Sequence, residues 1–178
     1  FEPDTKHFKD MTEYMDYCVG RILDHLDKKN LAEDTMVIFY SDNGTHLDIT
    51  SDTINGKVAG GKGWTTDAGT HVPLIVRWKG HIQPNISNEL TDSTDLLATC
   101  VHVAGSEVDR KIDGVSIYPN LMDPKHKIKD HIFCFYDPRP GWDKDQFTKL
   151  VFARDKRYKL YEDGRLFDIE KDVLEQKP

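Results

Sequence analysis

The segment that most restricts the fold is residues 35–40, TMVIFY, a short apolar, β-branched and aromatic run without polar alternation. Such a run is typical of a strand covered on both faces within a parallel sheet. Before it, apolar residues recur at steps of three and four over residues 8–26, which predicts an amphipathic helix. Asn30 can end this helix in the left-handed conformation. The two segments predict an α/β layer in which the helix packs against the sheet.

A second apolar strand is predicted at residues 73–78, after a glycine-punctuated loop of residues 42–72. This loop exceeds the roughly 12–15 residues that structureless connections usually reach, so we interpret it as a functional loop. Two parallel strands leave the faces and edges of a doubly wound sheet uncovered. We therefore expect further strands upstream, with this chain as the carboxyl-terminal part of a longer α/β domain.

The second half of the chain is predicted to contain a further helix and then a series of short strands. Ser93 or Thr94 can cap a further helix that Gly105 ends. The predicted apolar face of this helix consists of Leu97, Cys100, Val101 and Ala104. From about residue 130, short β-rich segments alternate with turn residues, including the hairpin signal Asp163-Gly164. We predict two parts, an α/β part over residues 1–129 and a small antiparallel sheet over residues 130–178.

Charge and hydropathy exclude two classes of partner. The net charge of -7 comes from intermixed acids and bases, without the basic run that a nucleic-acid partner requires. The longest apolar runs are far shorter than the ~20 residues that a membrane-spanning helix needs. The sequence therefore predicts no nucleic-acid partner and no membrane span.

The first candidate site is Asp42-Asn43-Gly44, directly after the TMVIFY strand. Ligands of open α/β sheets bind beyond the carboxyl ends of the strands. A carboxylate and an amide oxygen are hard ligands suited to Ca²⁺ or Mg²⁺. Gly44 lets the chain turn away sharply. The alternative interpretation is a plain Asp-Asn-Gly turn without a ligand.

The second candidate is Lys62, which three glycines flank at positions 60, 61 and 63. Glycine leaves the backbone free to approach an anion, and the ammonium is a compact charge able to neutralise a sulfuryl or phosphoryl oxygen. A solvated lysine in a flexible loop is the alternative.

Together and in this order, the segments resemble the sulfatase family of the alkaline phosphatase superfamily. The SDNG-like strand end, the GGKG-type loop and the RVPLIVRWPG-like strand of that family correspond to residues 35–44, 60–63 and 71–80. Weaker resemblance continues through residues 112–116, 157–161 and 166–169. It implies the carboxyl-terminal part of an alkaline-phosphatase-like α/β sandwich plus a small antiparallel sheet. The implied activity is hydrolysis of a sulfuric ester, on a sulfated carbohydrate or an aryl sulfate.

The resemblance also implies roles for individual residues. Asp42 and Asn43 fall on ligands of a divalent cation, usually Ca²⁺, with Mg²⁺ as the alternative. Lys62 falls on the sulfate-binding lysine, where it would stabilise negative charge on the transferring group. His71 stands where many members have arginine, and His46 follows Gly44 by two residues. Both histidines are candidate substrate contacts, although we favour a structural or rim role for each.

One element of the family's chemistry has no counterpart here. Its nucleophile is a formylglycine made from a cysteine in a C-x-P-S-R or C-x-A-x-R context, and neither Cys18, Cys100 nor Cys134 has that context. We therefore expect formylglycine, and the residues that complete the metal site, in an amino-terminal portion of the same protein. This chain alone is expected to be inactive. The resemblance implies a periplasmic, extracellular or lysosome-like compartment.

Two other functions stay open at this point. A phosphatase or phosphodiesterase of the same superfamily more often carries an Asp-His-Gly turn with zinc ligands, and Asp42-Asn43-Gly44 lacks that imidazole. A non-catalytic carbohydrate-binding or interaction domain would use the antiparallel sheet as its surface. Arg139 and Trp142 are candidates for lining a substrate cleft, with a proline-stiffened surface turn as the alternative.

Overall fold

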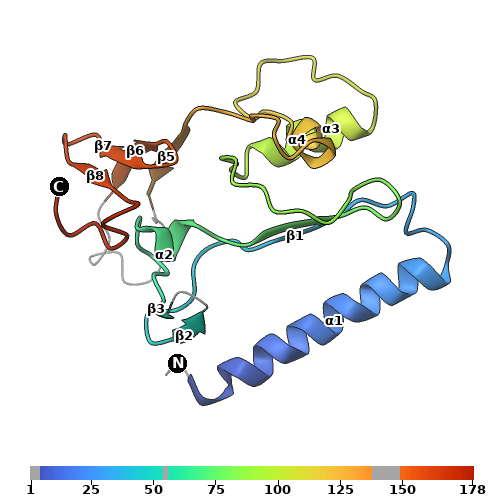
Figure 1. Ribbon diagram of the computed structural model, residues 1–178, viewed down its shortest axis with the longest axis horizontal. Coiled ribbons are helices and arrows are strands. Elements are labelled where there is room, and N and C mark those ends of the chain that lie inside the picture. The colour runs from blue at the N-terminus through green and yellow to red at the C-terminus, as the bar shows by residue number, and fades with distance from the viewer. Residues whose placement is uncertain (1–4, 54–55, 138–148) are drawn as a thin grey trace. The chain divides into compact units, whose positions relative to one another are not determined.

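The computed structural model describes residues 5–53, 56–137 and 149–178 of the chain. The chain divides into two compact units, Phe1–His81 and Ile82–Pro178. Figure 1 labels their helices and strands. The boundary predicted between residues 129 and 130 concerns the domains of the longer protein and stays a prediction. Across the described residues, no helix combines the length and the apolar character that crossing a bilayer requires.

Helix α1, Phe8–Lys28, confirms the predicted amphipathic helix, and the short 3₁₀ turn η1, Thr5–His7, precedes it. Asn30 has a φ of 55°, the left-handed conformation predicted for the helix end. The apolar stripe packs against the sheet only in part, because none of the residues of α1 is fully buried and Met11 is 67% exposed. A helix of 21 residues is about 32 Å long, whereas a four-residue strand spans only about 13 Å. The strands are therefore too short to cover the whole length of α1.

The sheet beside α1 consists of β1, Val37–Tyr40, and β4, Leu74–Arg77. The parallel pairing predicted from the sequence is wrong, because the two strands pair antiparallel, with Tyr40 opposite Leu74. An apolar run without alternation indicates burial on both faces, which is common in parallel sheets but does not determine the direction of a particular pair of strands. In the described residues this two-stranded sheet is not covered on both faces, since Ile75 is 61% exposed. The antiparallel pairing places the end of β1 beside the start of β4.

Residues of α1 and of this sheet line a groove, and two ion pairs link the end of α1 to β4 and the residues after it. The groove has a volume of about 470 Å³ and is lined by Thr12, Glu13, Met15, Asp16, Val19, Phe39 and Ile75. The Asp27 carboxylate accepts hydrogen bonds from Lys79 at 2.6 Å and from Arg77 at 3.3 Å. None of the predicted site residues lines the groove, so it lies apart from the candidate site.

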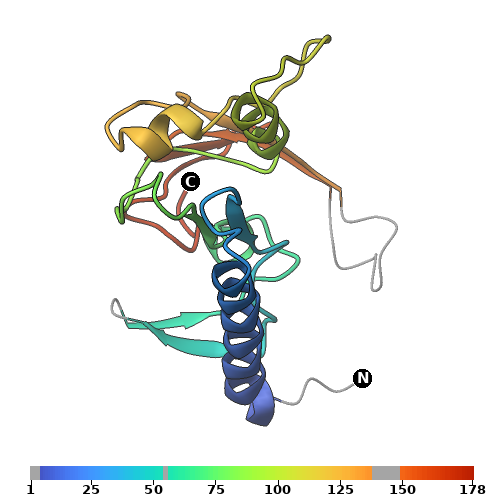
Figure 2. The same cartoon turned by 90° about the vertical axis from the view of Figure 1, so that its right-hand side faces the viewer.

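The connection from β1 to β4 is a structured loop. It contains a hairpin of β2, Thr50–Thr53, and β3, Gly56–Ala59, and the short helix α2, Asp67–Thr70. Figure 2 shows the hairpin as a ribbon beside α1. The hairpin is not predicted from the sequence, because its strands, TSDT and GKVA, have no regular apolar alternation.

In the second unit, helix α3, Asp95–Val103, ends before Gly105, whose φ is 64°. Thr94, one of the two predicted caps, stands at the N-cap position, but its hydroxyl makes no cap hydrogen bond and instead donates to Asp92. The predicted apolar face is also not the buried one. Leu97 is 50% exposed, and the fully buried residues of α3 are Asp95 and Thr99.

The polar face of α3 is buried because Asp95 is the centre of a network of hydrogen bonds and ion pairs. Its carboxylate accepts hydrogen bonds from the Val115 amide at 2.7 Å, the Thr91 hydroxyl at 3.0 Å and the Asp92 amide at 3.0 Å. The Lys129 ammonium lies 2.7 Å from Asp95 and 2.9 Å from Asp92. Hydrogen bonds to every side of a buried charge offset the free energy of its desolvation. The network therefore holds three separate segments of the second unit together.

The network makes the stability of this unit depend on pH in a defined direction. Burial acts to raise the pKa of Asp92, but hydrogen bonds from Thr94 and Lys129 outweigh it and hold the pKa below its ordinary value of 3.8. A lowered carboxyl pKa contributes stability that is present above the ordinary value and is lost as pH falls through the folded-state value. We expect Asp92→Asn to destabilise the chain at pH 7 and to matter progressively less below about pH 4. Urea unfolding of both proteins from pH 7 to pH 2.5 measures this, and a constant difference would contradict it.

The predicted antiparallel sheet of the second unit is confirmed. Its order is β5-β6-β7-β8, and all neighbours are antiparallel. The strands are β5 Ile132–Tyr136, β6 Leu150–Arg154, β7 Tyr158–Tyr161 and β8 Leu166–Asp168, and the short helix α4 Tyr118–Met122 precedes them. Gly164, at the predicted hairpin turn, has a φ of 90°. The core cluster consists of Phe152, Tyr161, Phe167 and Ile169.

A buried lysine lies next to this aromatic core. Lys159 is fully buried, and its ammonium lies 2.7 Å from Glu175 and 4.2 Å from the centre of the Phe152 ring. The Tyr161 hydroxyl donates a hydrogen bond to the same glutamate at 2.5 Å. Glu175 therefore ties the end of the chain to the sheet.

Candidate functional site

The Asp42-Asn43 turn begins directly at the end of β1. The Ser41 amide donates to the Pro73 carbonyl at 3.3 Å, just before β4 begins. The Ser41 hydroxyl donates to the Asn43 carbonyl at 3.0 Å and so holds the turn closed. With the backbone fixed in this way, the Asp42 side chain is exposed and the Asn43 side chain is half-buried. Both side chains leave a rigid turn at the strand end, as the sequence analysis predicts.

Glycines pack this turn tightly against the loop that follows Lys62. The Gly44 amide donates to the Gly69 carbonyl at 2.9 Å, and a Cβ added at Gly44 would lie 2.0 Å from the Ala68 carbonyl oxygen. A Cβ added at Gly69 would lie 2.1 Å from the Trp64 carbonyl oxygen. Backbone meets backbone here, and any larger residue would separate the segments. The sequence predicts a sharp turn at Gly44, but it does not predict this close approach or the contribution of Gly69 to it.

Lys62 is fixed to the same turn through its own backbone. Its amide donates to the Thr45 carbonyl at 2.9 Å, two residues beyond Asn43. Gly60 donates to the Ile49 carbonyl at 2.8 Å, which closes the base of the β2–β3 hairpin. The structure therefore brings the Lys62 segment beside the Asp42-Asn43 segment, although the β2–β3 hairpin separates them in sequence.

The side chains of Asp42, Asn43 and Lys62 make no polar contacts that stabilise the fold among the described residues. Within the described parts of the chain, the Asp42 carboxylate, the Asn43 amide and the Lys62 ammonium form no hydrogen bond and no ion pair. Other charged groups behave differently, since Lys57 pairs with Asp52 at 2.8 Å and Lys129 pairs with Asp95. A carboxylate, an amide and an ammonium with no structural partner are available to bind a ligand.

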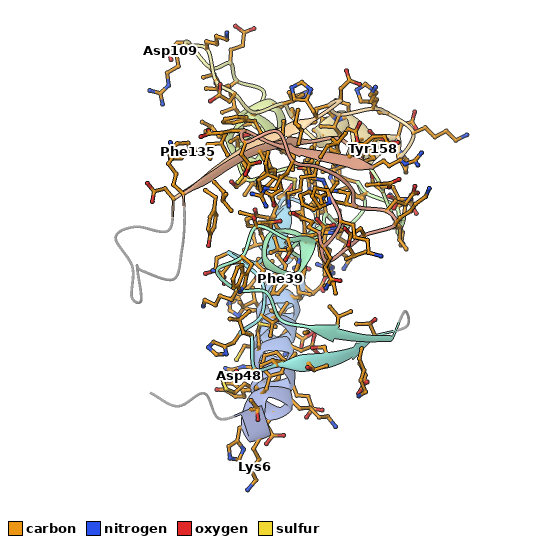
Figure 3. The ribbon with its side chains drawn as sticks, turned by 90° about the vertical axis from the view of Figure 1, so that its left-hand side faces the viewer. Lys6, Phe39, Asp48, Asp109, Phe135 and Tyr158 are labelled. Atoms are coloured by element: carbon orange, nitrogen blue, oxygen red, sulfur yellow. The ribbon has the colours of Figure 1, made fainter. Side chains whose placement is uncertain are left out.

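The two candidate histidines lie in the same loops, and the Nδ1 atom of each lies near a local carboxylate. His46 Nδ1 lies 3.5 Å from a carboxylate oxygen of Asp48, which Figure 3 labels, and accepts a hydrogen bond from the Asp48 amide at 3.3 Å. His71 Nδ1 lies 3.7 Å from a carboxylate oxygen of Asp67, and the His71 side chain is 75% exposed. This geometry suits a rim position. Direct contact of either histidine with a substrate stays a prediction.

The donor set fits a hard cation in part. Asp42 and Asn43 offer oxygen ligands, which Ca²⁺ and Mg²⁺ prefer, and Ca²⁺ takes about six to eight such ligands. In the described ranges, no group of three or more histidine, cysteine, aspartate or glutamate side chains is arranged to hold a metal. Asp42 and Asn43 can therefore serve as two ligands of a cation whose other ligands come from elsewhere. Arg139 and Trp142, the candidate cleft residues, lie outside the described residues.

The glycine packing leads to a matched pair of substitutions. We expect Gly44→Ala to destabilise the first unit by about 2 kcal/mol, because the new methyl group meets a fixed backbone carbonyl. Gly20→Ala in α1 is the control, since a Cβ there meets nothing within 4 Å. In a helix interior this change stabilises by about 0.5–1 kcal/mol. Urea denaturation of the two variants measures the difference, and equal effects would contradict the close packing.

Two protein-family models match this chain. The model described as Sulfatase matches residues 5–106, and the model described as N-sulphoglucosamine sulphohydrolase, C-terminal, matches residues 61–177. The two matches overlap across the Lys62 loop and β4. Between them they include every candidate site residue.

Individual proteins and a solved structure are also similar to this chain. Human Arylsulfatase H is 37% identical over 140 residues, which are 72% of this chain and 24% of that protein. Human Arylsulfatase A is 30% identical over 156 residues, 86% of this chain and 30% of that protein. Among solved structures, BT4656 in complex with its substrate D-glucosamine-2-N,6-O-disulfate has a TM-score of 0.67 at 20% identity, covering 89% of this chain and 32% of that one. The chain thus spans about a quarter to a third of the length of these relatives.

Proposed function

Because the chain belongs to the sulfatase family, we propose that it supplies part of the cation and sulfate site of a sulfuric ester hydrolase. The remaining part of that site, with the formylglycine nucleophile, belongs to an amino-terminal portion of the same protein. By itself the chain performs no turnover, since none of its cysteines has the context from which formylglycine is made. The expected compartment is periplasmic, extracellular or lysosome-like.

In this proposal Asp42 and Asn43 hold a divalent cation, with Ca²⁺ favoured over Mg²⁺. When bound, the cation neutralises and orients the sulfate oxygens. Lys62 stabilises the negative charge that these oxygens carry in the transition state. The observation that carries the proposal is the hydrogen bond from the Lys62 amide to Thr45, which joins the lysine loop to the Asp42-Asn43 turn while leaving all three side chains without a partner.

The substrate proposed is a sulfated carbohydrate or an aryl sulfate. Support comes from a structural relative solved with a sulfated glucosamine and from relatives named as arylsulfatases. A phosphate ester is disfavoured, because Asp42-Asn43-Gly44 lacks the imidazole that a zinc phosphatase site would use. His46 and His71 lie at the rim, where they contact the alcohol portion of the ester at most.

The experiment is metal-dependent hydrolysis by the intact enzyme. We expect 4-nitrophenyl sulfate or a sulfated glucosamine to be hydrolysed, the activity to be lost after calcium chelation, and Ca²⁺ to restore it. Asp42→Ala should raise the Ca²⁺ concentration that half-restores activity, because it removes a charged ligand. Hydrolysis of phosphate esters by an enzyme that contains two zinc ions and no calcium would contradict the proposal.

A further inference from the structure

The four residues Gly61-Lys62-Gly63-Trp64 form one tight turn. The Trp64 amide donates to the Gly61 carbonyl at 2.8 Å, and Gly63, the third residue, has a φ of 91°. A positive φ at the third position is the requirement of a type II turn. Lys62 and Trp64 therefore stand two residues apart on a backbone of fixed geometry.

This turn is anchored at both ends. A Cβ added at Gly61, which is buried, would lie 2.6 Å from the Ala68 carbonyl carbon, and a Cβ added at Gly69 would lie 2.1 Å from the Trp64 carbonyl oxygen. Thr65, directly after the tryptophan, is 5% exposed. The backbone of Trp64 is consequently held in place by its neighbours, independently of the indole.

Trp64 is 51% exposed as a whole residue. Across the described residues, no acceptor takes its Nε1 proton and no ring packs on it. Trp78 offers a contrast, because its Nε1 donates to the Glu33 carbonyl at 2.6 Å and its ring stacks on His81 at 4.2 Å. Tryptophan is strongly buried on average, and this half-exposed tryptophan stands two residues from Lys62 on the same turn, where it is accessible to a ligand that the lysine binds.

We propose that Trp64 is a specificity-determining residue that stacks on the ring of the alcohol portion of the sulfate ester. This rests on the proposed function, in which Lys62 holds the sulfate. An indole face attracts a flat or C–H-rich ring through dispersion and its quadrupole. Trp64 thereby selects esters whose ring begins directly beyond the sulfate group, while the sulfate group itself is bound without it.

The test compares sulfate esters with and without a ring, using the intact enzyme and binding calorimetry under conditions that prevent turnover. We expect Trp64→Ala to weaken binding of 4-nitrophenyl sulfate and of glucosamine 6-sulfate about 5- to 10-fold. Binding of methyl sulfate, which has no ring, should be unchanged. Trp64→Phe should restore most of the loss, and the thermal unfolding midpoint of both variants should match that of the wild type.

Different results separate this assignment from the proposed function. A loss confined to 4-nitrophenyl sulfate or to glucosamine 6-sulfate keeps the assignment and identifies the ring as aryl or sugar. An equal loss for methyl sulfate, or no loss for any ester, overturns it and leaves the proposed function standing. Failure of the wild type to bind methyl sulfate overturns both.

Discussion

We expect Lys62→Ala to lower kcat/KM for sulfate ester hydrolysis by the intact enzyme about 100- to 1000-fold, the loss typical for removal of one positioned electrostatic group. Among the described residues, Lys62 takes part in the hydrogen bonding of the loop only through its amide, which donates to the Thr45 carbonyl at 2.9 Å. Alanine preserves that amide, so the variant should fold normally. The loss then reports the missing charge.

Lys57→Ala is the matched control for this substitution. Lys57 is an exposed lysine of the same loop, but its ammonium pairs with Asp52 at 2.8 Å. Exposed ion pairs contribute little, so activity should stay within about twofold of the wild type. Inhibition by inorganic sulfate should weaken in Lys62→Ala and be unchanged in Lys57→Ala. Equal activities of the two variants would show that Lys62 does not face the transferring group.

The second large effect concerns stability, and we expect Lys129→Met to destabilise the chain by about 3–5 kcal/mol. The Lys129 side chain is 12% exposed, and it neutralises Asp95, whose side chain is fully buried. Methionine fills a similar volume but leaves the carboxylate without a counter-charge. Three hydrogen bonds from Thr91, Asp92 and Val115 remain, yet they cannot replace the charge.

Lys127→Met provides the control, because Lys127 pairs with Asp130 on the surface and both side chains are more than 60% exposed. Its effect should stay below about 1 kcal/mol. Combining Lys129→Met with Asp95→Asn should recover part of the loss, since the amide carries no charge. The free energies of unfolding come from urea denaturation, and a loss below 1 kcal/mol in Lys129→Met would contradict the role of the network.

The parts of the fold that the sequence predicts well are those determined locally. The end of α1 follows from the tolerance of Asn30 for positive φ, and the β7–β8 hairpin follows from Asp163-Gly164. Strand positions follow from short apolar segments between turn residues. In each case neighbouring residues determine the conformation, so one stretch of sequence is sufficient.

The parts that the sequence does not predict depend on distant partners. The antiparallel direction of β1 and β4 depends on where a long loop returns the chain. Lys129 and Asp95 are 34 residues apart, and nothing local marks Asp95 as buried. In β7 the buried residues are Lys159 and Tyr161, whereas Leu160 is 49% exposed, so hydropathy alone would turn the strand the wrong way. Glu175 makes the observed orientation possible by neutralising Lys159.

The candidate site, too, is predicted from the sequence only in part. Asp42, Asn43 and Lys62 are predicted from their residue types and from the order of the motifs. The close contact of Gly44 with Ala68 becomes apparent only in three dimensions, because these residues are far apart in the chain. This glycine contact brings the Asp42-Asn43 turn and the loop after Lys62 together, and their joint use as a site stays a prediction.

The most direct measurement is a crystal structure of the intact enzyme with Ca²⁺ and sulfate. The account predicts one Ca²⁺ about 2.3–2.6 Å from side-chain oxygens of both Asp42 and Asn43. It also predicts that the Lys62 ammonium lies within about 3 Å of an oxygen of a sulfate bound to that ion. A cation bound without Asp42 and Asn43, or a sulfate out of reach of Lys62, would contradict it.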